Sequence, residues 1–394
     1  MTQSVVRIAM VAGEASGDLL ASQLIAALRV KMPNAAFYGV GGPKMAAQGF
    51  VSWHPLEKLA VRGYVEVLKH YREISGIRRN LKKRLLADPP DVFIGVDAPD
   101  FNLALEKALK QHGIASIHYV SPSIWAWRGE RIHKIGAAVS RVLALFPFEP
   151  ALYEKQGIPV TYVGHPLADM LPLADGRPGA RELFSLPDAQ PVFALLPGSR
   201  QSELQYMADT FIETARAIHR SLPHALFLVP MATRETRLLF ETAIYRCRAS
   251  ELPIRLLFGH AHEAMMAADV VLVASGTATL EAALLKRPMA IAYKMAPLSY
   301  RLMRGMGYLP YVGLPNILAG KFVVPEFIQD DATPDNLAQA LLNLYADKAC
   351  RARIAGLFGK MHLQLKQNAA EKAAAAVVEC LPIPVLDDAL LAAA

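Results

Sequence analysis

The sequence predicts an α/β protein of two doubly wound, Rossmann-like domains that face each other across a cleft. Three observations support this fold class. Short apolar runs alternate with helical patterns through most of the 394 residues, which is typical of parallel sheets with helices on both faces. A stretch rich in proline, glycine and aspartate, residues 164–180, interrupts the alternation. The chain then restarts with an apolar strand and a turn, so we expect a sheet in each half.

The predicted elements follow one another in the same order in both halves. Strands of the first half are expected near Val5–Ala12, Ala36–Val40, Asp91–Val96, Ile114–Val120, Arg141–Phe146 and Val160–Val163. Its helices are expected near Asp18–Lys31, Ser75–Ala87, Phe101–Gln111 and Glu149–Gln156. Strands of the second half are expected near Val192–Leu196, Ala225–Val229, Ile254–Phe258, Val270–Ala274 and Met289–Tyr293. Its helices are expected near Gln201–Arg220, Thr233–Arg248, Ala261–Ala267, Thr277–Lys286 and Pro334–Tyr345. Ligands of such domains bind beyond the carboxyl ends of the strands.

Composition favours a cytoplasmic protein. Hydrophobic residues make up 53% of the chain, yet no apolar run reaches the ~18 residues of a membrane-spanning helix. The N-terminus has neither the basic start nor the cleavage pattern of a signal peptide. The three cysteines, Cys247, Cys350 and Cys380, are far apart and form no metal or disulfide pattern, which fits a reducing compartment.

The net charge of +7 indicates an anionic partner. Residues 69–84 carry seven lysines and arginines against one acid, directly after an apolar patch that includes Val65, Val67 and Leu68. An apolar patch beside a basic helix can hold a protein on an anionic bilayer. The alternative is an ordinary amphipathic helix with its apolar side in the core. Nucleic acid is not favoured, because no recognition motif accompanies the charge.

The turn after the strand Val270–Ala274 predicts a nucleoside-diphosphate site. Ser275, Gly276 and Thr277 break the apolar run before a helix, and Ser275 or Thr277 can cap that helix. Backbone N–H groups at a helix N-terminus suit a diphosphate. Glu281 lies one turn after Thr277 on nearly the same face, where its carboxylate could accept both ribose hydroxyls. The alternative is a capped helix with a solvated glutamate.

A second turn, Gly198-Ser199-Arg200, follows the first strand of the same half. Gly198 would let the backbone approach a ligand, and Arg200 could bind a diphosphate through two N–H groups. The alternative for Arg200 is a surface ion pair with Glu203. Two turns suited to anions at one edge of a sheet support a binding site more strongly than either turn alone.

The first strand of the chain leads into the loop Gly13–Asp18, GEASGD. This loop lacks the third glycine of a dinucleotide fingerprint, and no P-loop is present, so NAD and FAD are not expected. Its backbone can still hold an anion or a sugar, with Glu14, Ser16, Gly17 and Asp18 as the candidate residues. In the alternative interpretation, Ser16 or Asp18 only caps the helix.

Asp97 is the candidate catalytic residue. It directly follows the strand DVFIGV, at the position where α/β enzymes place catalytic groups, and could act as a general base. Asp100 begins the next helix and is the simpler N-cap. The alternative for Asp97 is a carboxylate that only stabilises the turn. Asp18 and Glu14 are the rival candidates for the base, since their loop should lie at the same edge of the sheet.

No metal site is predicted. His260 and His262 form an H-x-H pair, but no cysteine or further histidine near them completes a ligand set. Helix capping or contact with a base is the better interpretation of these histidines. The chain has no D-x-D motif for a metal-held nucleotide sugar, so arginine and helix dipoles are expected to hold a diphosphate without a metal or other cofactor.

Several longer motifs resemble one enzyme family. They are AGEASGD (12–18), DAPDFN (97–102), HYVSPSIWAWR (118–128), FPFE (146–149), YVGHPLAD (162–169), LLPGSR (195–200), ASGTATLEAAL (274–284) and LPNILAG (314–320). On these motifs the chain resembles the bacterial lipid-A-disaccharide synthases from about Arg7 to Cys380. Only the tail after Cys380 departs from the family pattern.

The resemblance implies a GT-B glycosyltransferase with a defined reaction. The family joins UDP-2,3-diacylglucosamine to 2,3-diacylglucosamine 1-phosphate at the cytoplasmic face of the inner membrane, giving a β-1′,6-linked disaccharide 1-phosphate and UDP. The implied domains are an acceptor- and membrane-facing domain (1–168) and a UDP-sugar domain (169–345). Residues 346–394 would supply helices that cross back, exchanged in a homodimer, and a tail. Asn316, in LPNILAG, joins the implied UDP-sugar residues.

Two alternatives to this function stay open on the sequence. Another GT-B protein, such as a UDP-N-acetylglucosamine 2-epimerase or a different lipid-linked GlcNAc transferase, would share the nucleotide site. A two-domain binding protein would hold a UDP-sugar without turnover and would not need Asp97.

Overall fold

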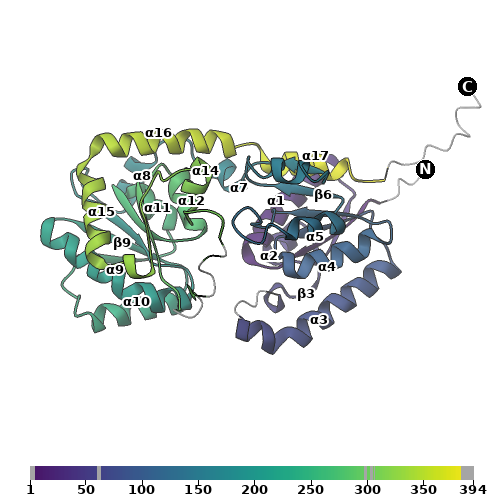
Figure 1. Cartoon of the computed structure of the whole chain (residues 1–394), viewed down its shortest axis with the longest axis horizontal. Helices are drawn as coiled ribbons and strands as arrows, with labels where there is room; N and C mark the ends of the chain where they lie inside the picture. The colour runs from purple at the N-terminus through teal and green to yellow at the C-terminus, as the bar shows by residue number, and fades with distance from the viewer. Residues whose placement is uncertain (1–4, 60–63, 297–299, 302–304, 306, 383–394) are drawn as a thin grey trace, which may run out of the picture. The chain divides into compact units, whose positions relative to one another are not determined.

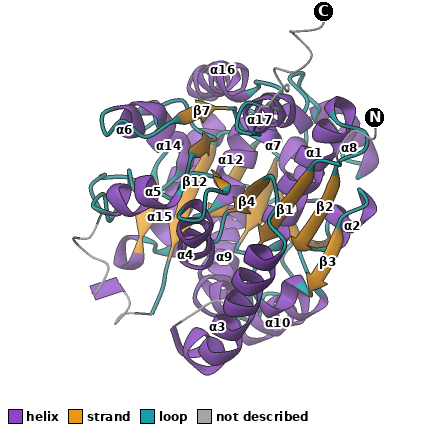
Figure 2. Ribbon diagram, turned by 90° about the vertical axis from the view of Figure 1, so that its right-hand side faces the viewer, coloured by secondary structure: helices purple, strands orange, loops and turns teal. Residues whose placement is uncertain are grey.

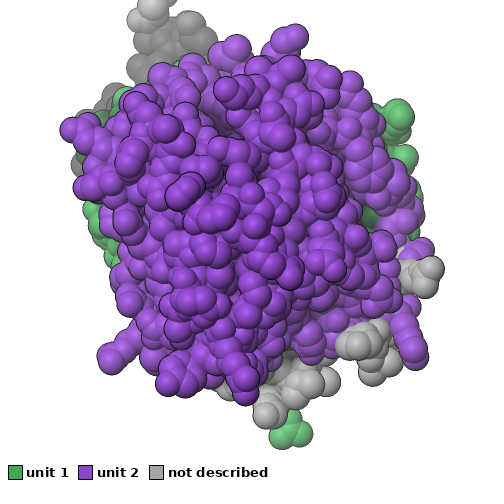
Figure 3. Space-filling model, turned by 90° about the vertical axis from the view of Figure 1, so that its left-hand side faces the viewer, with its two compact units in different colours: residues 1–166, 367–394 green, residues 167–366 purple. Residues whose placement is uncertain are grey.

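The computed structural model describes residues 5–59, 64–296, 300–301, 305 and 307–382, without the side chains of 57 and 64–71. The chain divides into two compact units. Unit 1 contains residues 1–166 and 367–394, and unit 2 contains residues 167–366; Figure 3 colours them separately. None of the described helices is long and apolar enough to cross a membrane.

Unit 1 is built on a seven-stranded parallel sheet with the order β3-β2-β1-β4-β5-β6-β7. Figure 2 shows β3, β2, β1 and β4 side by side. The strands are β1 (Arg7–Ala12), β2 (Ala36–Val40), β3 (Val51–His54), β4 (Val92–Val96), β5 (Ala115–Tyr119), β6 (Arg141–Ala144) and β7 (Val160–Tyr162). The sequence did not predict β3, an edge strand whose residues are exposed or half-buried and which therefore lacks an apolar run.

The helices of unit 1 cover both faces of this sheet. They are α1 (Ala15–Lys31), α2 (Pro43–Ala47), η1 (Leu56–Lys58), α3 (Tyr64–Ala87), α4 (Pro99–Lys110), α5 (Arg131–Ala138), α6 (Pro150–Glu154) and α17 (Ala369–Val378). Alternate residues of β1 enter different clusters, Ile8 and Met10 in one and Ala9 and Val11 in the other. Burial on both faces explains why β1 is a continuous apolar run.

Unit 2 contains a six-stranded parallel sheet with the order β10-β9-β8-β11-β12-β13. Its strands are β8 (Val192–Leu196), β9 (Leu226–Met231), β10 (Ile254–Phe258), β11 (Val270–Ala274), β12 (Met289–Tyr293) and β13 (Glu326–Ile328). Its helices include α8 (Arg177–Leu183), α9 (Gln201–Ser221), α10 (Arg234–Arg246), α11 (Ala261–Ala267), α12 (Thr277–Leu284), α14 (Leu314–Ala319), η2 (Gln329–Asp331), α15 (Pro334–Ala346) and α16 (Lys348–Leu365). Two parallel α/β sheets confirm the predicted fold class.

The chain passes between the units at two points. The short helix α7 (Pro166–Met170) begins at the first, and α16 ends just before the second. Helix α17 then packs against α1 in unit 1 (Figure 1). Ala373 and Val377 share a core cluster with Leu24 and Leu28 of α1. Small alanine side chains along α17 let the two helices approach closely.

Candidate functional site

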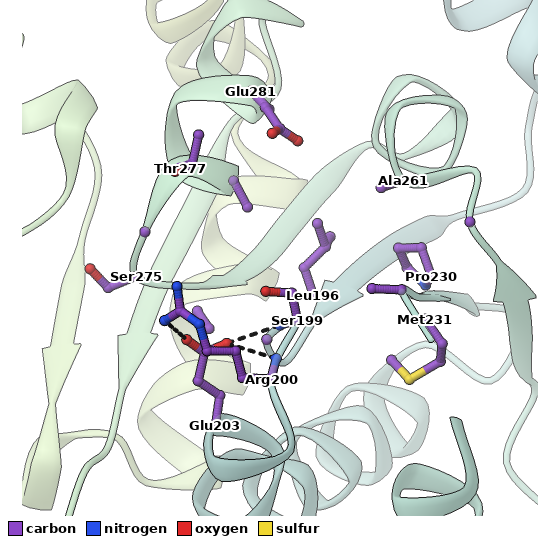
Figure 4. A pocket seen from close by; sticks show the side chains of 16 residues that line it. Leu196, Ser199, Arg200, Glu203, Pro230, Met231, Ala261, Ser275, Thr277 and Glu281 are labelled. Atoms are coloured by element: carbon purple, nitrogen blue, oxygen red, sulfur yellow. Dashed lines mark hydrogen bonds and ion pairs between the residues drawn. The ribbon is translucent and has the colours of Figure 1, made fainter. Parts of the chain in front are cut away.

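Most of the residues predicted for the nucleotide site line one cavity of unit 2. The cavity has a volume of about 310 Å³ and lies beyond the carboxyl ends of β8 and β11. Seven of the eight predicted residues line it: Gly198, Ser199, Arg200, Ser275, Gly276, Thr277 and Glu281. Figure 4 shows Arg200 and Glu203 on one side of the cavity and Pro230, Met231 and Ala261 on the other.

The start of α12 differs from the prediction in one detail. Gly276, with φ of +142°, occupies the N-cap position, and no described side chain caps the helix there. Ser275 and Thr277 therefore are not the cap, because the chain enters the helix through a glycine backbone that has no side-chain oxygen. The hydroxyl of Thr279 donates to the Gly276 carbonyl at 2.7 Å. Gly276, Thr277 and Ala278, at the start of α12, all line the cavity.

The Gly198 turn is organised around Glu203. One carboxylate oxygen, Oε2, accepts from the backbone N–H groups of Ser199 at 2.9 Å and Arg200 at 3.2 Å. The other, Oε1, accepts from the Arg200 guanidinium at 2.9 Å. A Cβ at Gly198, where φ is +130°, would lie 2.6 Å from the Glu203 carboxylate. The ion pair that the sequence left as an alternative for Arg200 is thus present, at the edge of the cavity.

Glu281 has a partner that the sequence did not identify. Nε2 of His262 lies 3.2 Å from Oε2 of Glu281. This hydrogen bond raises the pKa of His262, because a carboxylate at this distance favours the protonated imidazole. The described residues contain no group of three or more ligands that could hold a metal ion. In this structure His262 is the hydrogen-bonding partner of Glu281.

Two further turns contribute to the cavity. Pro230 and Met231 are the last residues of β9, Ala232 follows them, and Gly259 follows β10. These residues carry no charged or hydroxyl group, so the sequence offered no chemical signal for them. Their strand-end position is the signal that could have identified them.

Asn316 does not line this cavity, and its contact with the UDP-sugar stays a prediction. It is fully buried, and its amide nitrogen donates to the carbonyl of Val324 at 2.9 Å and to Glu326 at 2.8 Å. Its oxygen accepts from the N–H groups of Val323 and Val324. In this structure the hydrogen-bonding groups of the side chain fix the segment before β13.

In unit 1, the GEASGD loop and the Asp97 turn are in contact. They follow β1 and β4, which are neighbours in the sheet. A Cβ at Gly13 would lie 2.6 Å from Cβ of Ala98, so only glycine permits this approach. Asp97 and Ala98 are half-buried, and both have positive φ angles, 54° and 44°. Strained non-glycine turns of this kind are often found at functional sites.

Asp18 has a structural role in unit 1, and its assignment as an acceptor-side residue stays a prediction. Its side chain is buried, and its carboxylate accepts from the N–H groups of Gly42 at 2.9 Å, Lys44 at 3.0 Å and Met45 at 3.0 Å. It thereby caps α2, because these N–H groups have no partner within that helix. Both oxygens of the Asp18 carboxylate are therefore bonded to the backbone at the start of α2.

The other residues of the loop lie at the start of α1. Glu14 occupies the N-cap position, and its carbonyl accepts from the N–H of Asp18 at 2.9 Å. Ser16 is exposed, whereas Gly17 is buried. A Cβ placed on Gly17 would lie 3.5 Å from the carbonyl oxygen of Val96. Glu14 and Ser16 thus remain accessible candidates, and Gly17 allows α1 to start close to β4.

A buried carboxylate that the sequence did not single out lies in the FPFE motif. Oε2 of Glu149 accepts from the backbone N–H groups of Leu145 at 3.0 Å and Phe146 at 2.9 Å, and Oε1 accepts from Trp125 at 3.1 Å. Burial raises the pKa of Glu149 to about 7, against the opposing effect of these hydrogen bonds. Trp125 also packs edge-on against Phe146 and Phe148. The carboxylate therefore joins two loops at the carboxyl end of the sheet.

The basic stretch lies on α3, which begins at Tyr64, well before the predicted Ser75. Ile77, Leu81 and Leu85 are buried in the core, and Arg84 stacks on Trp53 at 3.7 Å. The second half of α3 therefore is an amphipathic helix on the sheet. The side chains of Val65, Val67 and Leu68 lie outside the described residues.

Comparisons with known proteins agree with this architecture. A family model described as lipid-A-disaccharide synthetase matches residues 8–380. The lipid-A-disaccharide synthase of Dechloromonas aromatica is 68% identical over 96% of this chain and 99% of its own length. That of Aromatoleum aromaticum is 62% identical over 95% of this chain and 96% of its own.

Solved structures share the fold at low sequence identity. A kitacinnamycin glycosyltransferase superposes with a TM-score of 0.64 at 17% identity, covering 96% of this chain and 100% of that chain. WaaG, a glycosyltransferase involved in lipopolysaccharide biosynthesis, gives 0.55 at 14% identity, over 95% and 99% of the two chains. The UDP-GlcNAc 2-epimerase of Neisseria meningitidis gives 0.61 at 13%, over 95% and 99%. These neighbours identify the fold as GT-B.

The family model spans nearly the whole chain, and the sequence identities extend over the full length of the relatives. The chain is accordingly a glycosyltransferase that forms the lipid A disaccharide, and it belongs to the lipid-A-disaccharide synthase family.

Proposed function

We propose that the enzyme transfers the diacylglucosaminyl group of UDP-2,3-diacylglucosamine to the 6-hydroxyl of 2,3-diacylglucosamine 1-phosphate. The products would be the β-1′,6-linked disaccharide 1-phosphate and UDP. The observation that carries the proposal is the cavity at the carboxyl ends of β8 and β11, lined by two turns suited to anions and by Glu281. Family membership supplies the class of acceptor and product.

In the proposed complex, UDP occupies this cavity without a metal ion. The diphosphate would lie against the N-terminus of α12, where N–H groups and the helix dipole favour negative charge. Arg200 would turn from Glu203 toward the diphosphate, since a guanidinium binds phosphate oxygens through two N–H groups. Glu281 would accept the ribose hydroxyls, held in place by His262.

The chemical step is proposed to be a single inverting displacement. The acceptor 6-hydroxyl attacks the anomeric carbon from the face opposite UDP while the bond from that carbon to the diphosphate oxygen breaks. The hydroxyl proton passes to Asp97, and UDP leaves with the bonding electrons. A positioned carboxylate typically contributes about 10²–10⁴-fold to such a step. Glu14 is the alternative base, because its loop touches the Asp97 turn at Gly13.

We also propose peripheral attachment to the cytoplasmic face of the inner membrane. The substrates carry acyl chains, and residues 69–84 bear seven basic residues against one acid. Lysine and arginine near an anionic surface contribute about 1 kcal/mol each. Val65, Val67 and Leu68, at the start of α3, would supply the apolar contact.

A homodimer in which α17 is exchanged between chains is part of the same proposal. Helix α17 lies beyond the second crossing of the chain and buries an alanine-rich face on α1. Exchange of a terminal element of this kind requires no new contacts. Sedimentation of the full-length protein tests this proposal, and a concentration-independent monomer would contradict it.

The decisive experiment is an assay with both proposed substrates in detergent micelles. We expect stoichiometric UDP and disaccharide 1-phosphate, with the β configuration at the new linkage visible as a large anomeric proton coupling. A parallel reaction without the acceptor should release no UDP. Epimerised UDP-sugar in that parallel reaction would indicate an epimerase, and UDP-sugar binding without turnover would indicate a binding protein.

A further inference from the structure

Three polar side chains are buried directly beneath the turn that carries Asp97. Asn102 and Glu106 lie one turn apart on α4, and His118 lies on β5; all three are fully buried. Nδ1 of His118 lies 2.7 Å from Oε1 of Glu106. Nδ2 of Asn102 donates to the Asp97 carbonyl at 2.8 Å and to the Val11 carbonyl at 3.3 Å. The cluster thus connects α4, β5 and β1 to the turn.

Gly95 provides the space for this cluster. It pairs with His118 in the register of β4 and β5. A Cβ at Gly95 would lie 2.1 Å from Oε1 of Glu106 and 2.9 Å from Cβ of Asn102. The glycine therefore lets α4 lie close enough to the sheet for its polar side chains to reach β5 and the Asp97 turn.

Stability alone gives no reason for such a cluster. Within the described part of the chain, Oδ1 of Asn102, Oε2 of Glu106 and Nε2 of His118 are buried without a hydrogen-bond partner. Unsatisfied buried polar atoms are costly, and well-packed apolar side chains of similar size often stabilise a core better than an ionic pair. The polar groups must therefore be explained by what they hold.

What they hold is a strained turn. Asp97 and Ala98 both adopt left-handed backbone angles, which non-glycine residues rarely adopt. The Asp97 N–H donates to the Tyr119 carbonyl at 2.8 Å, and the Asp97 carbonyl accepts from Asn102. The peptide groups on both sides of the Asp97 Cα are therefore anchored, which fixes the position from which its side chain extends.

We propose that Asn102 is a positioning residue for the transfer reaction and that the Glu106–His118 pair holds it in place. Asn102 holds the backbone of Asp97 through a hydrogen bond to its carbonyl. The Glu106–His118 pair connects α4 to β5, so that the Asn102 amide stays within hydrogen-bonding distance of the turn. Asp97 then presents its carboxylate to the acceptor hydroxyl from one fixed backbone position. This inference rests on the proposed role of Asp97 as the base.

The test compares kcat and KM among variants of α4. Asn102→Leu keeps the side-chain size and removes the donor, and Asn102→Ser serves if the first variant does not fold. We expect kcat to fall by about tenfold or more with KM for both substrates unchanged, because small misplacement of a catalytic group is costly. Glu106→Gln, which can still bond His118, should retain more kcat than Glu106→Leu.

Leu105→Ala is the matched control, because Leu105 is buried on the same helix but packs in an apolar cluster. It should lower the melting temperature and leave kcat unchanged. The positioning role is overturned if both Asn102 variants keep kcat within about twofold of wild type, or if Leu105→Ala loses kcat to the same extent. Normal turnover of Asp97→Asn would instead overturn the base assignment itself, so the two failures are distinguishable.

Discussion

His262 and Glu281 form a hydrogen-bonded pair, 3.2 Å from Nε2 to Oε2, that joins α11 to α12 beside the cavity of unit 2. Glu281 is the residue proposed to hold the ribose, and a partner on another helix, His262, already sets its orientation beside the cavity. A carboxylate held in this way loses less side-chain freedom when a ligand binds.

The first prediction concerns the pH dependence of this pair. Glu281 raises the pKa of His262 above its ordinary value, so the folded state binds the proton more tightly than the unfolded state. The stabilisation is therefore complete below the unfolded pKa of about 6.5 and is lost as the pH rises through the folded pKa. Both side chains are partly exposed, which limits the effect to about 1 kcal/mol.

The melting temperature of Glu281→Gln should accordingly be lower than that of wild type at pH 5.5 and equal to it at pH 8.5. The pKa of His262, measured by NMR, should fall in this variant. Glu241→Gln, which breaks an exposed pair with Arg237 on α10, is the control and should show no such pH dependence. An unchanged His262 titration in Glu281→Gln would contradict the pairing.

A second prediction concerns UDP affinity. Arg200→Ala should weaken UDP binding by about 1.5–3 kcal/mol, the range for a hydrogen bond to a charged group, and Glu281→Ala should also weaken it. Titration calorimetry with UDP measures both. Arg237→Ala, which removes an exposed arginine of unit 2 that does not line the cavity, should leave affinity unchanged. If Arg200→Ala and Glu281→Ala both bind UDP normally, the nucleotide lies elsewhere.

A third prediction concerns Asp97. Asp97→Asn keeps the size of the side chain and removes the base, so kcat should fall by about 10²-fold or more while UDP affinity stays normal. Asp100→Asn is the matched control: Asp100 lies three residues later and pairs with Arg131 at the surface. EDTA should not change the rate. Near-normal turnover of Asp97→Asn would shift the base to Glu14, and inhibition by EDTA would argue for a metal.

A fourth prediction concerns the membrane. Replacing Val65, Val67 and Leu68 together by serine should lower binding to anionic liposomes, measured by co-sedimentation, while the melting temperature is retained. The control replaces Leu238 and Tyr245, exposed apolar residues of unit 2, by serine and should bind liposomes normally. If the triple variant unfolds, the patch belongs to the core and not to a membrane surface.

A fifth prediction concerns Glu149. Burial raises its pKa to about 7, so its contribution to stability is present at acidic pH and is lost as the pH rises from about 4.5 through 7. At 1.36 kcal/mol per pH unit the loss is roughly 3 kcal/mol. Urea unfolding between pH 5 and 8 measures it, and Trp125 fluorescence should titrate over the same range. Glu149→Gln should remove most of this dependence of the unfolding free energy on pH. An equal pH dependence in the variant would mean that another group causes it.

The sequence predicted most of the strands because each is a run of apolar residues, and burial on both faces makes that run continuous. It missed β3 and β13, which are edge strands with half-buried or exposed residues and therefore lack the signal. It also missed the short helix α2, which is held by a contact distant in sequence, the Asp18 carboxylate.

For the candidate site, the sequence by itself determined which turns meet. Parallel strands bring their carboxyl ends to one edge, so Gly198, Arg200 and Glu281 could be placed near one another from strand order alone. Only the tertiary structure decided what each side chain does there. It committed Asn316 and Asp18 to neighbouring backbone, paired Glu281 with His262 and set Asn102 beneath Asp97. The physical reason is that strand periodicity is local, whereas the partner of a hydrogen-bonding group is chosen by residues far along the chain.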